Sequence, residues 1–313
     1  MMVSRFTNCL CVVSILVLAL VGVRFALPCI AQELEPRNWS HIPVDTNYLG
    51  AGYVYTEEDI FFDPTLRIED TESDIDSFAI KYIRSFELLG KLARIEVLPI
   101  YQEARWKGLL EESPRTVHRS GFADPILRFA VNLVGSPPLA GDEYRQYRAN
   151  TEHETIVGAG LAIQLPLGEY FDDKLLNLGG NRFVFRPQLG LVRDWGAWSV
   201  EVTTAAALFT ENDDFFGNTR REQDPFYTIQ TQLVYSFRPA LWLAVGMGYG
   251  RGAESEIDGV TKDDERENLA WGVNFGFPLS QRVGAKIGYI GTNAEESVGA
   301  DSANLQLALI TYW

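Results

Sequence analysis

Hydrophobic and polar residues alternate with a period of two along most of the chain beyond residue 31. The pattern is clearest in residues 78–88, 124–134, 182–192 and 227–237, where one parity is largely apolar and the other carries charged or amide side chains. Successive side chains of a β-strand point to opposite faces, so this pattern predicts strands with one apolar and one polar face. We count about 12 such segments of roughly 9 to 13 residues, longer than the five or six residues typical of soluble sheets and suited to crossing a bilayer at a tilt.

The predicted connections between these strands alternate between short and long. Tight turns are expected at 89–91, 194–196, 238–240 and 278–280, and long loops at 57–76, 102–121, 167–181, 211–225, 251–267 and 292–302. A further connection, 134–153, opens with Pro137-Pro138 and is expected to contain a short helix. Short turns on one side and long loops on the other are the plan of an outer-membrane barrel. The sequence therefore predicts an all-β fold: a transmembrane antiparallel up-and-down β-barrel of about 12 strands.

The first 31 residues differ from the rest of the chain. Arg5 precedes an apolar run over residues 9–23, and Cys29-Ile30-Ala31 offers small residues where a signal peptidase reads. We expect a signal peptide over residues 1–31 and a barrel over residues 32–313 in the bacterial outer membrane. An uncleaved anchor is the alternative, although a run of about 15 residues is short for a spanning helix.

The last strand carries Leu305, Leu307, Leu309, Thr311 and Trp313 on one parity. We expect it to pair with the first strand, because an open sheet edge in lipid would leave backbone groups unpaired. Leu305, Leu307, Leu309 and Trp313 would then face lipid, with Trp313 at headgroup level. A terminal aromatic resembles the signal that the outer-membrane assembly machinery recognises. Aromatic residues make up 12% of the chain, however, so chance alone would sometimes place one at the end.

The lumen-facing parity is rich in small residues. These are Gly158, Gly160, Ala162, Ala205, Ala207, Gly246, Gly248, Gly250, Gly272, Gly276, Gly284 and Gly288. They either let the sheet curve tightly or leave room inside the barrel, which matters because about 12 strands lie between a filled and an open barrel. Charged residues share the polar parities: Arg94, Glu96, Arg128, Arg182, Arg186, Glu201 and Lys286. They are candidates for a solute path, or for paired charges that fill the interior.

Charge and motifs exclude several functions. The formal charge of -15 argues against nucleic-acid binding, which requires a basic face. The loops 57–76, 211–225 and 251–267 hold 21 of the 42 acidic residues, and no spacing among them matches a calcium loop, so no metal site is predicted. The motifs of zinc hydrolases, serine hydrolases and nucleotide-binding loops do not occur, so no catalytic residue and no cofactor is predicted. One alternative is a phospholipase A-like site formed by His118, Ser120 and Asn132.

Several segments resemble one bacterial family in order and spacing. They are residues 36–43, Phe62-Asp63-Pro64, residues 121–125, Val131-Asn132-Leu133, residues 165–170, residues 176–182 and Gln223-Asp224-Pro225. The resemblance is to the outer-membrane transporter-like proteins of the MetA pathway of phenol degradation, and it implies a barrel with a transport role. The chain departs from the family pattern at Gln188, where a glutamate is expected, and at Ser136-Pro137-Pro138.

The sequence thus predicts a channel that admits small organic solutes, aromatic compounds among them, by facilitated diffusion. Arg182 and Arg186 are the leading candidates to guide anions, with Asn181 forming the turn before them. The expected partners are outer-membrane lipid and lipopolysaccharide, the assembly machinery and the solute itself. The rival hypothesis is an adhesion or scaffolding barrel that presents its acidic loops.

Overall fold

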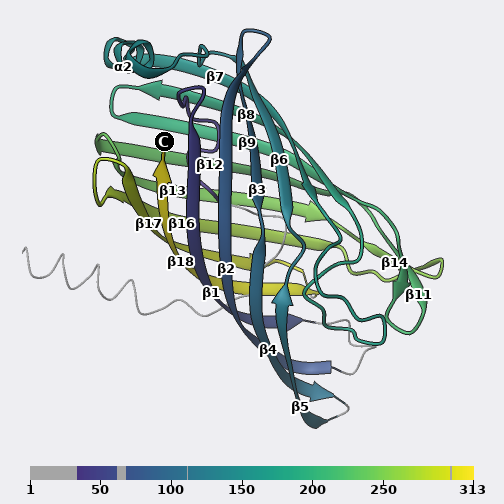
Figure 1. Cartoon of the computed structure of the whole chain (residues 1–313). Coiled ribbons are helices and arrows are strands. Elements are labelled where there is room, and N and C mark those ends of the chain that lie inside the picture. The colour runs from purple at the N-terminus through teal and green to yellow at the C-terminus, as the bar shows by residue number, and fades with distance from the viewer. Residues whose placement is uncertain (1–33, 62–67, 111, 297) are drawn as a thin grey trace, which may run out of the picture.

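A computed structural model of the chain describes residues 34–61, 68–110, 112–296 and 298–313. The expected signal peptide lies outside the described residues, as does the segment 62–67 between the first two strands. Twelve antiparallel strands close into a barrel (Figure 1). Its wall consists of β1 (Asn47–Phe61), β2 (Ile68–Leu88), β3 (Lys91–Leu98), β6 (Ile126–Val134), β7 (His153–Gln164), β8 (Val184–Trp195), β9 (Trp198–Phe209), β12 (Phe226–Arg238), β13 (Leu241–Gly252), β16 (Arg266–Pro278), β17 (Val283–Ala294) and β18 (Gly299–Tyr312).

The seam of the barrel joins its first and last strands, as predicted. β1 pairs with β18 without interruption from Tyr48 opposite Tyr312 to Phe61 opposite Gly299. The backbone of Asn47 also exchanges two hydrogen bonds with that of Trp313, at 3.0 and 3.1 Å. The first and last strands therefore leave no unpaired sheet edge at the seam, as contact of the wall with lipid requires.

The outer face of the barrel is apolar. Leu305, Leu307 and Leu309 are 43%, 43% and 51% exposed, and their exposed neighbours across the sheet include Ala51 of β1 and Ile287 of β17. Trp313 is 59% exposed at the end of β18. Exposed apolar side chains in a continuous band are stable in contact with acyl chains rather than water. Among the described residues, no helix has the length and hydropathy needed to span a membrane.

The two ends of the barrel differ in their connections. One end carries the tight turns at 89–90, 196–197, 239–240 and 279–282, the helix α2 (Gly141–Asn150) and Trp313. Leu89 and Gly90 both have positive φ, at 51° and 75°, as a two-residue hairpin turn requires. The opposite end carries the long connections, and it lies away from α2 in Figure 1. The tight-turn end is therefore periplasmic and the other end extracellular, and the predicted alternation of connections is confirmed at these turns.

Two of the predicted long loops are instead strands. In the first, β1 continues to Phe61 and β2 begins at Ile68. In the second, β4 (Ile100–Leu110) and β5 (Ser113–Phe122) form a hairpin that continues the wall outward from β3 and β6. The prediction failed because strands that leave the bilayer no longer need an apolar outer face. Backbone pairing and ion pairs such as Arg105 with Asp74 hold them instead.

The extracellular end is closed further by irregular structure. β5 pairs with β4 but not with β7, and its other edge meets the β7–β8 loop, where the Glu169 amide donates to the Phe122 carbonyl at 2.8 Å. A small second sheet is formed by β10 (Asn212–Phe215), β11 (Thr219–Gln223), β14 (Ser255–Ile257) and β15 (Val260–Thr261). The predicted loops 211–225 and 251–267 thus contain short strands.

Candidate functional site: the barrel interior

Residues 34–44, which we call the inner segment, lie inside the barrel. Trp39 is fully buried, and a β-carbon added to Gly158 or Gly190 would lie 2.2 Å from its ring. Leu34 is 1% exposed and packs with Ala270 and Ile290. Trp39 therefore contacts β7 and β8, whereas Leu34 contacts β16 and β17, nearly opposite in the ring of strands. The inner segment crosses the lumen.

The small residues of the wall do make room, and the inner segment occupies it. Gly158, Gly160 and Gly190 accommodate the Trp39 ring, while Gly248 and Gly272 accommodate Leu34. A glycine on the wall removes one side chain so that a larger one from the inner segment can pack against the backbone.

Charged residues in the middle of the lumen are paired. Glu96 accepts a hydrogen bond from Arg128 at 2.5 Å and pairs with Lys81 at 2.9 Å. Arg94 pairs with the same carboxylate at 3.7 Å and also donates to the Asn38 carbonyl. The guanidinium carbon of Arg128 lies 4.8 Å above the Trp39 ring. Three cations thus share the Glu96 carboxylate, and Arg94 and Arg128 also contact the inner segment.

Polar groups of β9 fix the orientation of Trp39. Glu201 accepts hydrogen bonds from the backbone amides of Asn38 at 3.1 Å and Trp39 at 3.4 Å, and Thr203 accepts one from the indole at 2.9 Å. Asn132 donates to the Trp39 carbonyl at 3.3 Å. Each buried polar group of this tryptophan thus has a partner, which favours one position of the side chain.

A clamp at the periplasmic end holds the inner segment where it leaves the lumen. His41 is buried against the edges of Tyr144 and Tyr147 of α2, with ring centroids at 5.1 and 5.2 Å. Its Nε2 lies 2.9 Å from the Pro137 carbonyl and its Nδ1 lies 3.5 Å from the Glu154 carboxylate. Tyr144 also donates to the His41 carbonyl at 2.9 Å. The helix between β6 and β7 therefore fastens the inner segment to the wall.

The predicted lumen residues fall into two groups. Arg94, Glu96, Arg128, Glu201 and Lys286 contact the inner segment or one another, with Lys286 pairing with Glu35. Arg182 and Arg186 line a hollow toward the extracellular end. Arg186 also shares a row of the sheet with Arg128 and Glu96, through Ala162 of β7.

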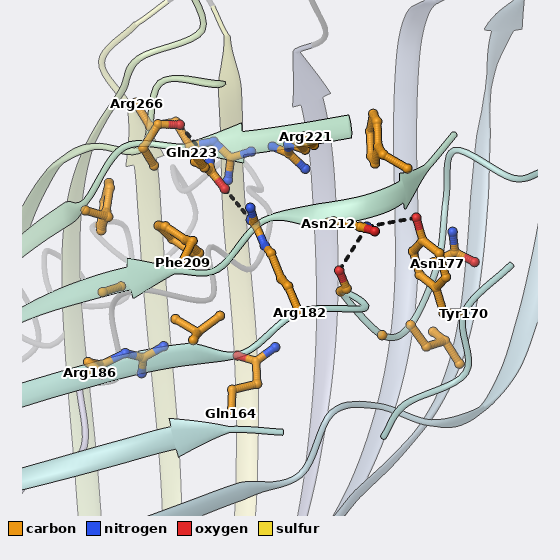
Figure 2. A pocket seen from close by; sticks show the side chains of 18 of the residues that line it. Gln164, Tyr170, Asn177, Arg182, Arg186, Phe209, Asn212, Arg221, Gln223 and Arg266 are labelled. Atoms are coloured by element: carbon orange, nitrogen blue, oxygen red, sulfur yellow. Dashed lines mark hydrogen bonds between the residues drawn. The ribbon is translucent and has the colours of Figure 1, made fainter. Parts of the chain in front are cut away.

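The second group lines a hollow that we call the outer cavity (Figure 2), with a volume of about 230 Å³. Four arginines reach it: Arg182 from the β7–β8 loop, Arg186 from β8, Arg221 from β11 and Arg266 from the start of β16. Its apolar lining includes Val184, Ala207, Phe226 and Ala253, which form one buried cluster with Phe209 against it. A cationic face and an apolar face thus meet in one hollow.

Arg182 is held between polar and aromatic neighbours. It donates to the Gln223 side chain, and its guanidinium carbon lies 4.5 Å from the Phe209 ring centroid (Figure 2). Burial, followed by the charges of Arg221 and Arg266, lowers the pKa of Arg182 to about 9. The group is still charged at neutral pH, and the direction of the shift reports mutual repulsion among desolvated cations.

Arg221 repeats this arrangement. Its guanidinium carbon lies 5.3 Å from the Phe215 ring centroid and it donates to the Ser255 hydroxyl at 2.9 Å. Burial and the charge of Arg266 lower the pKa of Arg221 to about 10, while Asp264 acts in the opposite direction. Asp264 itself accepts a hydrogen bond from the Ser255 amide at 2.6 Å.

Asp124 shapes the loop that carries Arg182. Its carboxylate accepts hydrogen bonds from the amides of Gly168 and Gly180, both at 2.8 Å, and from Gln164 at 3.1 Å. A β-carbon on Gly168 would lie 2.7 Å from the Asp124 amide nitrogen, so the close approach requires glycine. The segments 121–125 and 176–182, which carried part of the family resemblance, therefore meet in space.

A second hollow of about 350 Å³ lies beside the outer cavity and shares Leu175 with it. Trp106 and Val117 of the β4–β5 hairpin, with Leu176 and Phe216, provide an apolar lining, and Lys107, Arg115, Arg119 and Lys174 also border it. The two hollows are separated by residues of the β7–β8 loop.

The phospholipase-like constellation does not assemble. His118 and Ser120 lie in β5, in the extracellular hairpin, where His118 stands opposite Arg105. Asn132 lies in β6 within the lumen and bonds to Trp39. Among the described residues, no group of three or more histidine, cysteine or acidic side chains could hold a metal ion.

Sequence reasoning missed Trp39, Arg221 and Arg266. Trp39 was noticed only as part of the family-like segment 36–43, and its burial depends on glycines of distant strands. Arg221 and Arg266 stand in or beside stretches that were counted as acidic loops. An arginine within a stretch of acidic residues was the sequence feature that could have pointed to Arg221 and Arg266.

The family model described as "Putative MetA-pathway of phenol degradation" matches residues 66–307. The chain belongs to this family. No curated protein sequence matches this chain.

Among solved structures, an outer membrane channel from Pseudomonas putida F1 is similar with a TM-score of 0.73 and 23% sequence identity, over 90% of this chain and 100% of that one. The β domain of the Bordetella autotransporter BrkA aligns with a TM-score of 0.48 and 10% identity, over 86% and 100%. The CymD monoaromatic hydrocarbon channel aligns with a TM-score of 0.43 and 7% identity, over 93% and 95%. The likeness to the Pseudomonas putida F1 channel shows the fold, a closed β-barrel.

Proposed function

We propose that this barrel is an outer-membrane channel that admits small organic solutes, aromatic compounds among them, by facilitated diffusion. The outer cavity is the entry site and the inner segment is the barrier beneath it. The observation that carries the proposal is the position of the cavity inside the extracellular end of a closed barrel whose lower lumen is crossed by the inner segment. Membership of the phenol-degradation family supports the class of solute.

Passage requires the inner segment to move, because Trp39 fills the space that the wall glycines leave. The segment is held by side-chain contacts and hydrogen bonds rather than by strand pairing, so it can shift without opening the sheet. The barrel wall, by contrast, is fixed by continuous backbone pairing. The proposal includes no chemical step on the solute. The partners in this proposal are the membrane lipid and lipopolysaccharide around the barrel, and the assembly machinery that inserts it.

Planar-bilayer recording and liposome flux of the purified full-length protein test the proposal. Phenol and benzyl alcohol are suitable solutes, and a Trp39→Ala variant provides the barrel with its barrier weakened. We expect solute flux through the wild type and greater flux through the variant. If neither protein conducts ions or admits solute, the channel proposal fails and the scaffolding hypothesis, with its acidic outer strands, gains support.

A further inference from the structure

We infer that the outer cavity is a binding site for aromatic carboxylates, with the arginines meeting the carboxylate and the apolar cluster meeting the ring. This inference rests on the proposed function, because it names the class of solute that the entry site takes. The argument concerns the charge of the cavity, its shape and its separation from the paired charges deeper in the lumen.

The charge of the cavity is not balanced by the protein around it. Among the described residues, Arg182, Arg221 and Arg266 have no ion-pair partner. Nη1 of Arg182 and Nε of Arg266 are buried without any hydrogen-bond partner in this part of the chain. A buried donor left unsatisfied on a charged group costs more than one on a neutral group, so an anionic acceptor in the cavity would stabilise the arrangement.

The nearest carboxylates are committed elsewhere. Asp124 accepts hydrogen bonds from two loop amides and Gln164, and Asp264 accepts one from the Ser255 amide. The negative charges of both carboxylates act on the cavity, but each carboxylate is oriented by the backbone amides that donate hydrogen bonds to it. An anionic ligand is therefore the acceptor that the guanidinium groups still need.

The other face of the cavity selects a ring. Val184, Ala207, Phe226 and Ala253 present buried apolar atoms, so an inorganic anion would leave this surface uncovered. The volume of about 230 Å³ lies below the roughly 300–1,000 Å³ of sites for drug-sized ligands, which suits a single ring with a short substituent. The planar fork of arginine matches a carboxylate with two parallel hydrogen bonds.

Binding to the purified full-length protein in detergent tests this assignment without requiring transport. Isothermal titration compares benzoate with benzyl alcohol, which keeps the ring but loses the charge, and with acetate, which keeps the charge but loses the ring. We expect benzoate to bind at least roughly 10-fold more tightly than either, the value of one charge-assisted hydrogen bond. Equal binding of benzyl alcohol, or of acetate as an adventitious ion only, would overturn the inference.

Substitutions locate the site. Arg182→Gln and Arg266→Gln should each weaken benzoate binding roughly 10-fold and leave benzyl alcohol binding unchanged. Arg266→Gln is the safeguard, because Arg182 also bonds to Gln223 and its loss could disturb the loop. The matched control is Arg220→Gln: Arg220 neighbours Arg221 but is exposed and pairs with Glu211 and Glu222. Folding of each variant is checked by its heat-dependent mobility in gels.

The outcomes separate this inference from the channel proposal. If Arg220→Gln weakens benzoate binding as much as the cavity variants, or if neither cavity variant does, the cavity is not the carboxylate site. If liposomes admit phenol while benzoate fails to bind, this inference fails and the channel remains. If benzoate binds as expected and no solute crosses even with Trp39→Ala, the site remains and the channel proposal falls.

Discussion

The middle of the lumen and the outer cavity use buried charge in opposite ways. In the middle, Glu96 is surrounded by Arg94, Arg128 and Lys81, and Glu201 accepts two backbone amides from the inner segment. In the outer cavity, Arg182 and Arg221 bond to uncharged polar side chains and lie beside aromatic rings. Both regions belong to one barrel and lie partly on the same strand, β8.

This difference between the two regions indicates which buried charges have a structural role. Desolvating a charge is costly, and the cost is recovered only when a partner is close and well oriented. The cations in the middle have the Glu96 carboxylate as an ion-pair partner within the chain, and Arg94 and Arg128 also contact the inner segment. Among the described residues, Arg182, Arg221 and Arg266 lack an ion-pair partner, so their partner is expected to come from outside. Burial alone does not distinguish the two regions, whereas the ion-pair partners do.

A substitution that weakens docking of the inner segment in the middle region should have the largest effect on conductance. Trp39→Ala removes the side chain that fills the lumen between Gly158 and Gly190, at a packing cost of about 3–5 kcal/mol for docking of the inner segment. We expect a severalfold rise in single-channel conductance in planar bilayers with the barrel itself intact. Unchanged conductance would contradict the role of the inner segment as a barrier.

A wall substitution should expel the same tryptophan without altering the inner segment. Gly190→Ala places a β-carbon 2.2 Å from the Trp39 ring, and such overpacking costs about 1–3 kcal/mol. Conductance should rise, but by less than in Trp39→Ala. Gly52→Ala is the matched control, because its nearest contact would be the Leu307 carbonyl at an ordinary 3.7 Å. Equal effects of the two glycine variants would show that conductance does not report the position of Trp39.

Breaking the outer region should change selectivity instead of conductance. Arg266→Gln removes one cation from the cavity, and we expect the preference for chloride over potassium to fall, measured as a reversal potential across a salt gradient. The shift should be largest at low ionic strength, because salt screens partly exposed charge. A variant that conducts more but keeps its selectivity would place Arg266 with the structural charges of the middle.

The smallest effect is expected from a single hydrogen bond. Thr203→Val removes the acceptor for the Trp39 indole at 2.9 Å and keeps the volume of the side chain. The cost to docking of the inner segment is about 1 kcal/mol, so brief open events should become more frequent while the closed level stays the same. Long single-channel records of wild type and variant provide the measurement. Identical open probability would show that Glu201 and the wall glycines hold Trp39 without this bond.

Much of the wall could be predicted because its signals are local. The turn at Leu89 and Gly90, the helix between β6 and β7 and the seam of β18 with β1 all follow from patterns within a few residues, together with the need to close a sheet in lipid. The hairpin of β4 and β5 was missed for the same reason. Beyond the bilayer its outer face is polar, and the apolar alternation that marks a strand disappears.

The sequence by itself determined which parity of each strand meets lipid and which faces inward, because that choice repeats every two residues. The contacts of each inward residue depend on the tertiary structure. The Trp39 amide bonds to Glu201, 162 residues away in the sequence, and Lys286 bonds to Glu35, 251 residues away. Such pairs form only when the cylinder closes and the inner segment enters it. A period of two carries no information about which strands then face each other across the lumen, or about which arginines are left without a carboxylate.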